Sequence, residues 1–177
     1  IPEPFAYANL CKSLSDNWIE IKRHFEDKTV NETYKVSRIH LRKLHEREEL
    51  FEMNYKNFSK DGAPEQDIVI KSRFIASADI STCFPSVYSH SIAWSLVGKN
   101  YAKINKNPTN WFNQIDYYTR NVKFGETNGL LIGPHASNLL SEIILVAVDF
   151  ELLNQGFKYI RNIDDYTCYV NSFEESD

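Results

Sequence analysis

The stretch Tyr159-Ile-Arg-Asn-Ile-Asp164-Asp165-Tyr-Thr-Cys-Tyr-Val170 decides how the chain is expected to fold. Two runs of β-branched and aromatic residues, which favour strands, flank the adjacent carboxylates Asp164 and Asp165. Because Asp favours turns, the pattern predicts a β-hairpin with the carboxylate pair at its tip. Neighbouring like charges are costly unless a cation neutralises them, and Mg²⁺ or Mn²⁺ would accept their oxygens. A solvated turn is the alternative interpretation.

A third carboxylate, Asp79, ends an apolar and β-branched segment that is predicted to be a buried strand over 67–80. Carboxylates are rare at the end of a buried strand unless they have a partner, so Asp79 is a candidate metal ligand. The alternative role for Asp79 is an N-cap or an Asx-turn before the next helix.

The remaining pattern predicts helices punctuated by loops. A Pro-containing, irregular lead-in at 1–12 precedes a helix from residue 15 or 16 to 26. A hairpin is predicted over 34–54, with Arg38, His40 and Arg42 on one face, although a helix also fits its apolar spacing. Beyond it we expect a polar loop at 56–66, helices at 85–97, 111–122 and 135–154, a polar loop at 100–110 and a glycine-punctuated loop at 124–134. This mixture favours an α+β domain.

Composition narrows the class of protein. The chain has 177 residues, of which 42% are hydrophobic and 14% aromatic, as in a globular domain. Three scattered cysteines without a C-x-x-C pair favour a reducing cytoplasm, and no apolar run is long enough to predict a membrane span. The net charge of −4 is unusual for a nucleic-acid binder. The Ile-Pro-Glu-Pro start and the acidic end are expected of a fragment of a longer polypeptide.

Three segments resemble, in order, motifs A, B and C of bacterial reverse transcriptases of the abortive-infection and antiphage-defence groups. The first is Asp79-Ile-Ser-Thr-Cys-Phe84-Pro-Ser-Val-Tyr-Ser-His-Ser-Ile-Ala-Trp94. The second is Gly129-Leu-Leu-Ile-Gly133-Pro134-His-Ala-Ser137-Asn-Leu-Leu-Ser-Glu142-Ile, and the third is Ile163-Asp-Asp-Tyr166. The resemblance covers 79–166 and is looser over 1–60.

The resemblance implies the fingers and palm of a right-hand polymerase, with the thumb absent from this chain. Residues 1–78 would form the fingers and a lead-in, and 79–98 the palm around motif A. Residues 99–133 would connect fingers and palm, and 134–177 would carry the motif B helix and the motif C hairpin. Three converging carboxylates suit two-metal nucleotidyl transfer, in which one ion activates the attacking hydroxyl and the other steadies the triphosphate.

The resemblance also implies roles for individual residues. Asp79, Asp164 and Asp165 would be catalytic and would bind Mg²⁺, or alternatively Mn²⁺, together with the backbone carbonyl of Ile80. Phe84 would clash with a ribose 2′-hydroxyl and so select dNTPs, a core aromatic being the alternative. Further nucleotide contacts would come from Gly133, Pro134, Arg38 and Arg42.

Two positions depart from the family's pattern, since Leu131 stands where a Pro is common and Asn162 where an aromatic is common. Both would lie beside primer and template, and some relatives extend DNA without a conventional template or prime from a protein hydroxyl. The expected partners are dNTPs, an RNA template or associated non-coding RNA, and the DNA product; homo-oligomers are left open. The rival hypotheses are an RNA-dependent RNA polymerase and a degenerate palm that acts as an RNA- or partner-binding scaffold.

Overall fold

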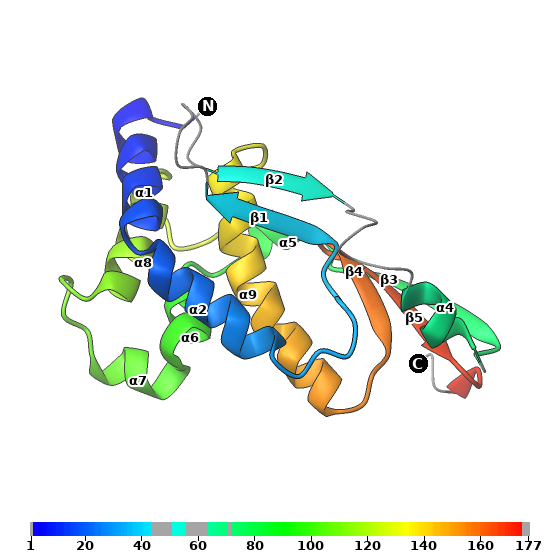
Figure 1. The fold of residues 1–177 in the computed structure, drawn as a ribbon. Coiled ribbons are helices and arrows are strands. Elements are labelled where there is room, and N and C mark those ends of the chain that lie inside the picture. The colour runs from blue at the N-terminus through cyan, green and yellow to red at the C-terminus, as the bar shows by residue number, and fades with distance from the viewer. Residues whose placement is uncertain (1, 44–50, 56–63, 71, 175–177) are drawn as a thin grey trace.

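The computed structural model describes residues 2–43, 51–55, 64–70 and 72–174, and leaves the side chains over 40–65 and at 67 undescribed. Most helices gather at one end and a three-stranded antiparallel sheet lies at the other, with the long helix α9 (His135–Asn154) between them (Figure 1). The predicted α+β class is therefore confirmed. Among the described helices, none is both long enough and apolar enough to cross a membrane.

The helical end is built around α9. Helix α1 (Pro4–Asp16) packs on α8 (Trp111–Asn121), while α2 (Trp18–Thr29) and α6 (His90–Val97) pack on α9. Their apolar stripes meet in one core, as expected for amphipathic helices. The fully buried members of this core include Leu14, Ile21, Ile92, Ile115 and Ile143. The predicted helices at 111–122 and 135–154 are confirmed, and the helix predicted to start at 15 or 16 is found as α2.

Two segments that were predicted to be irregular are helical. The prediction of an irregular lead-in at 1–12 is wrong, because helix α1 begins at Pro4. Pro4 occupies the first turn of α1, and the Glu3 side chain accepts a 2.5 Å hydrogen bond from the Ala6 amide. Part of the 100–110 loop is also helical, as α7 (Lys99–Ile104). Gly98, at φ +85°, ends α6 and lets the chain turn directly into α7, where Ala102 is buried.

The helix predicted over 85–97 is divided into α5 (Cys83–Ser86) and α6. Val87 between them is extended, and the buried Ser89 donates its amide to the carbonyl of Thr127 at 2.8 Å. The break therefore allows this segment to bond to the glycine-punctuated loop before α9.

The predicted hairpins are both present. Strands β1 (Ile39–Lys43) and β2 (Phe51–Tyr55) pair antiparallel, which excludes the helical alternative there. In the second sheet the order is β3 (Phe74–Asp79), β5 (Asp165–Val170), β4 (Tyr159–Asn162). The polar loop predicted at 56–66 lies largely outside the described residues.

The buried strand predicted over 67–80 is wrong in two respects. Its first part is the short helix α4 (Pro64–Val69), and β3 is mostly exposed. The physical reason is its place at the edge of the sheet, where it pairs only with β5. The buried side chains of the sheet belong to β4 and β5, where Tyr159 and Tyr166 form a cluster with Val36.

Candidate acidic site at the ends of the sheet strands

The antiparallel pairing of β3 and β5 brings the predicted carboxylate residues together. Asp79, the last residue of β3, stands directly opposite Asp165, the first residue of β5. Just beyond this pair, the Ile80 amide donates a 3.2 Å hydrogen bond to the carbonyl of Asp164. The strand register therefore places the backbones of Asp79 and Asp165 opposite each other, with Asp164 and Ile80 adjoining them.

A tight turn at Ile163 and Asp164 presents the acidic pair. Strand β4 ends at Asn162 and β5 begins at Asp165, so two residues connect them. Ile163 has φ +57°, which is unfavourable for a β-branched residue and persists only where its surroundings hold it. The carbonyl of Ile163 accepts a 2.8 Å hydrogen bond from Nη1 of Arg161, which supplies that support.

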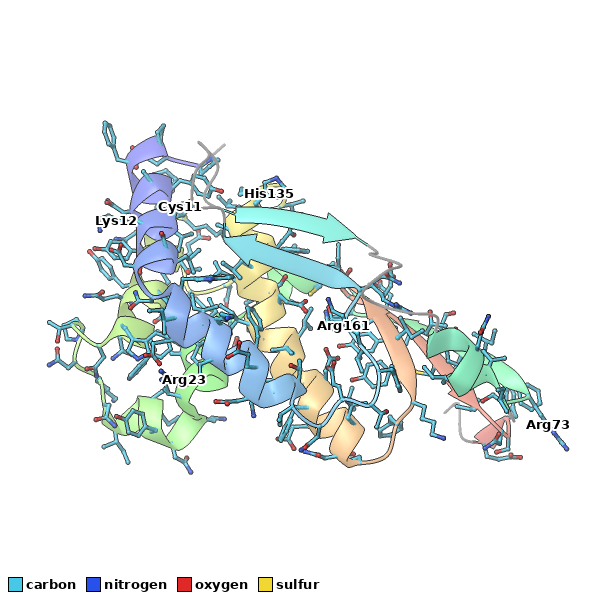
Figure 2. All side chains as sticks on the ribbon, viewed as in Figure 1. Cys11, Lys12, Arg23, Arg73, His135 and Arg161 are labelled. Atoms are coloured by element: carbon cyan, nitrogen blue, oxygen red, sulfur yellow. The ribbon has the colours of Figure 1, made fainter. Side chains whose placement is uncertain are left out.

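Arg161 is fully buried and ties the hairpin to α9 (Figure 2). Its Nε and Nη2 bind the Asp149 carboxylate, with Nε 2.9 Å from Oδ2, and its Nη1 and Nη2 bind Glu142 at 2.9 and 3.1 Å. Tyr159 completes the set because its hydroxyl donates to Asp149 Oδ1 at 2.9 Å. A buried charge is tolerated only when it is paired and hydrogen-bonded, and this guanidinium meets both conditions.

The electrostatics of this network fix the charge on Arg161. Burial opposes the charged guanidinium, but Glu142 and Asp149 raise its pKa above the ordinary value, so it stays protonated. Burial, and next the adjacent Asp149 carboxylate, raise the pKa of Tyr159, which keeps its hydroxyl as a donor. The sequence analysis did not assign this network. The sequence feature that could have indicated it is the pair of acids Glu142 and Asp149, which lie about two turns apart on a largely apolar helix face.

The candidate ligands themselves are more accessible than the network beneath them. Asp79 and Asp165 are exposed and Asp164 is half-buried, and none of the three forms an ion pair with another described residue. The buried residue Cys83 lies near these carboxylates. Burial raises the pKa of its thiol, and the nearby carboxylate of Asp164 raises it further. Within the described part of the chain the site is therefore acidic, without an ion-pairing partner, and accessible to a cation.

The donor chemistry suits a hard divalent cation. Asp79 and Asp164 offer carboxylate oxygens and Ile80 offers a carbonyl, which are the ligand types that Mg²⁺ and Mn²⁺ prefer. In the described part of the chain, no three His, Cys, Asp or Glu side chains gather closely enough to hold an ion by themselves. The side chains of Asp79, Asp164 and Asp165 therefore do not form such a group by themselves, and a metal site here would need the Ile80 carbonyl as well.

The glycine-punctuated loop lies against the segment that follows Asp79. The Gly129 amide donates to the Val87 carbonyl and the Leu130 amide to the Phe84 carbonyl, both at 2.7 Å. Phe84 is half-buried and packs on the helical core, so the core role weighed for its ring is present. Gly133, at φ +112°, and Pro134, the N-cap residue, lead directly into α9.

The two arginines proposed to contact nucleotide lie in different settings. Arg38 is only 3% exposed, so it does not lie on a solvated strand face, and its amide donates to the Arg161 carbonyl at 2.9 Å. It therefore lies beside β4, next to the buried network. Arg42 lies in β1 opposite Glu52, and its side chain is outside the described residues.

Comparison of the chain with protein-family models and with curated proteins found no match.

Proposed function

We propose that this chain is the fingers and palm of a metal-dependent DNA polymerase of the reverse-transcriptase type, acting in bacterial antiphage defence. The observation that carries the proposal is the register that places Asp79 opposite Asp165. Next to this pair, the Ile80 amide donates a hydrogen bond to the Asp164 carbonyl. The order of the three motif-like segments and the contact between the first two support it further.

The proposed chemistry assigns each group a task. Asp79, Asp164 and the Ile80 carbonyl would hold the cations, with Asp165 beside them. When bound, the cations would supply Lewis-acid activation of the hydroxyl and neutralisation of the triphosphate. The protein's own contribution is placement, since Arg161 fixes the turn and the strand pairing fixes the distance between the acids. A nucleic-acid 3′-hydroxyl or a protein hydroxyl would be the acceptor.

Phe84 would set the preference for dNTPs, in keeping with its position five residues after Asp79 in the resembling motif. The alternative of an RNA polymerase makes the opposite prediction. In the DNA polymerase, Phe84→Ala increases rNTP incorporation relative to dNTP incorporation. If the protein already incorporates rNTPs and Phe84→Ala leaves the ratio unchanged, the RNA polymerase is favoured.

The test uses the protein purified with whatever nucleic acid accompanies it, incubated with Mg²⁺ and each labelled dNTP and rNTP singly. Asp164→Asn removes a proposed ligand, and Asp27→Asn, which removes an exposed carboxylate on α2, is the matched control. We expect dNTP incorporation by the unaltered and control proteins and none by Asp164→Asn. Failure of all three proteins to incorporate, with nucleic acid still bound, would overturn the polymerase in favour of a scaffold.

A further inference from the structure

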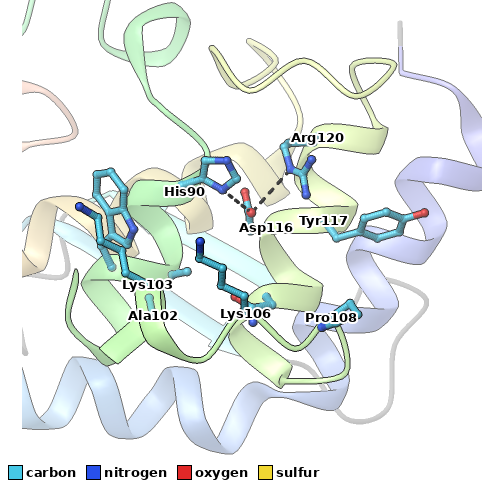
Figure 3. Close-up of a pocket in the computed structure, with 11 residues that line it drawn as sticks. His90, Ala102, Lys103, Lys106, Pro108, Asp116, Tyr117 and Arg120 are labelled. Atoms are coloured by element: carbon cyan, nitrogen blue, oxygen red, sulfur yellow. Dashed lines mark hydrogen bonds and ion pairs between the residues drawn. The ribbon is translucent and has the colours of Figure 1, made fainter. Parts of the chain in front are cut away.

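A second candidate site lies in the helical end and shares no residue with the acidic site. Helices α6, α7 and α8 line a cavity of about 410 Å³ that is open to solvent (Figure 3). Its volume is within the range of small-ligand sites. The residues with functional groups in its wall come from the helices and the connection between α7 and α8. They include Trp94, Lys103, Lys106, Asp116, Tyr117 and Arg120.

Asp116 is the most informative of these residues because it is a buried carboxylate that is half satisfied. Only 5% of the residue is exposed. Its Oδ2 lies 2.7 Å from His90 Nδ1 and 3.6 Å from Arg120 Nε, as the dashed lines in Figure 3 mark. Its Oδ1 is buried and has no hydrogen-bond partner among the described residues. A buried acceptor without a donor costs free energy, so a ligand that brings an N–H group to Oδ1 would relieve that cost.

The charge of the cavity favours an anion. Lys103 and Lys106 line the cavity and are exposed, and neither pairs with an acidic side chain in the described chain. Arg120 already compensates the charge of Asp116, since its Nε lies 3.6 Å from Oδ2, so the two ammonium groups give the cavity lining a net positive charge. Lysine binds phosphate as a point charge, which suits these flexible, solvent-facing side chains.

Aromatic rings complete the recognition chemistry. Trp94 on α6 is half-buried in the wall of the cavity and Tyr117 on α8 is half-exposed there. Both rings have a cation over them: Lys99 Nζ lies 4.8 Å from the Trp94 centroid and Arg120 Cζ lies 6.0 Å from the Tyr117 centroid. Tyr117 is the more exposed ring and its cation is the more distant, so it is the better stacking surface of the two. Every nucleobase has a face that stacks on such a ring, and bases with an amino group also offer N–H donors.

We infer that this cavity binds a nucleotide. Its phosphate lies on Lys103 and Lys106, its base stacks on Tyr117, and a base amino group donates to Asp116 Oδ1. A free nucleotide and a nucleotide within single-stranded nucleic acid share this chemistry. The inference does not depend on the polymerase proposal, because the residues and the charge are different and no metal ion is required.

The test measures binding of short fluorescein-labelled oligo(dA) and oligo(dT) to the whole protein by fluorescence anisotropy. EDTA is present, so that metal-dependent binding at the acidic site does not contribute. Lys103→Ala/Lys106→Ala is expected to weaken oligo(dA) binding roughly tenfold or more, and Tyr117→Ala to weaken it severalfold. The control Lys12→Ala/Lys22→Ala removes the same charge from exposed positions on α1 and α2, and is expected to bind nearly as the unaltered protein does.

A competition experiment distinguishes binding of a free nucleotide from binding of a nucleotide within a single strand. Displacement of oligo(dA) by unlabelled AMP at similar concentrations assigns the cavity to free nucleotides, and displacement only by oligonucleotide assigns it to single strands. Asp116→Asn is expected to reduce the preference for oligo(dA) over oligo(dT), because thymine lacks the amino group. Absence of binding, or equal weakening by the two double-lysine variants, would overturn the inference.

Discussion

Nη1 of Arg161 lies 2.8 Å from the carbonyl oxygen of Ile163, the residue directly before Asp164. The same guanidinium is held by Glu142 and Asp149 on α9, so the turn that presents the acids is anchored in the interior of the protein. The strained φ of Ile163 and the position of Asp164 therefore depend on a buried ion network that touches neither metal nor substrate. Arg161 is a positioning residue in the proposed reaction.

Replacing Arg161 is expected to be strongly destabilising. Arg161→Met fills similar volume but leaves Glu142 and Asp149 buried without their counter-charge, which costs about 3–5 kcal/mol. Chemical denaturation followed by circular dichroism measures the loss. A loss of stability under about 1 kcal/mol would contradict the network's role, because exposed ion pairs contribute no more than that.

A compensated variant separates loss of charge balance from loss of the turn. Arg161→Met combined with Glu142→Gln and Asp149→Asn removes the buried charges together and is expected to recover much of the stability. The hydrogen bond to Ile163 remains absent in it. If the polymerase proposal holds, this variant folds yet stays impaired in nucleotide incorporation. Full activity in a stable triple variant would remove Arg161 from its positioning role.

The hairpin could be predicted from sequence because its signals are local. Asp164 and Asp165 sit between two β-favouring runs, and the structure shows a two-residue turn in that place. The Arg161 network could not be predicted in the same way. An arginine in a strand and two acids in a helix are ordinary surface features until the tertiary fold buries all three against one another.

The burial of β3 shows another limit. Residues 67–80 are apolar enough to predict a buried strand, yet Phe74 and Ile75 in β3 are exposed. Local composition does not reveal which strand becomes the edge of a sheet, because that depends on the strand order β3-β5-β4. The register that places Asp79 opposite Asp165 depends only on strand pairing, so it does not require the burial that was predicted for this strand.

Removing one acid is expected to stabilise the protein in the absence of a divalent cation. Asp79 and Asp165 face each other across β3 and β5, and directly opposed like charges cost about 0.2–1 kcal/mol. Asp79→Asn should therefore raise the melting temperature in EDTA, as measured by differential scanning fluorimetry. Added Mg²⁺ should stabilise the unaltered protein and have less effect on the variant. Equal Mg²⁺ responses would argue against Asp79 as a ligand.

Gly129 is expected to tolerate no side chain. Its φ is +85°, and a Cβ there would lie 3.0 Å from the Pro85 carbonyl oxygen. Gly129→Ala thus combines an unfavourable backbone conformation with a steric contact, for a cost of about 2–4 kcal/mol. Gly125→Ala is the matched control because Gly125 has φ +87° with nothing near its Cβ position. Thermal unfolding should show the larger loss for Gly129→Ala, and equal losses would mean that the contact is relieved by movement of the loop.

Glu32 gives the protein a pH-dependent stability. Burial, with a further contribution from Asp149, raises the pKa of Glu32 to about 7, against an ordinary value of 4.5. The folded state therefore holds the Glu32 proton more tightly than the unfolded state does. The resulting stabilisation is complete below the unfolded pKa of 4.5 and is lost as the pH rises through 7.

Glu32→Gln keeps the shape of the side chain and removes its charge, so it is expected to stabilise the protein only where Glu32 would be ionised. At pH 8 the variant should melt at least about 3 °C above the unaltered protein, and at pH 4.5 the difference should nearly vanish. Melting curves across this range provide the measurement. Glu26→Gln, on the exposed surface of α2, is the control that should show no such trend. A stabilisation by Glu32→Gln that is the same at both pH values would show that ionisation of Glu32 is not its cause.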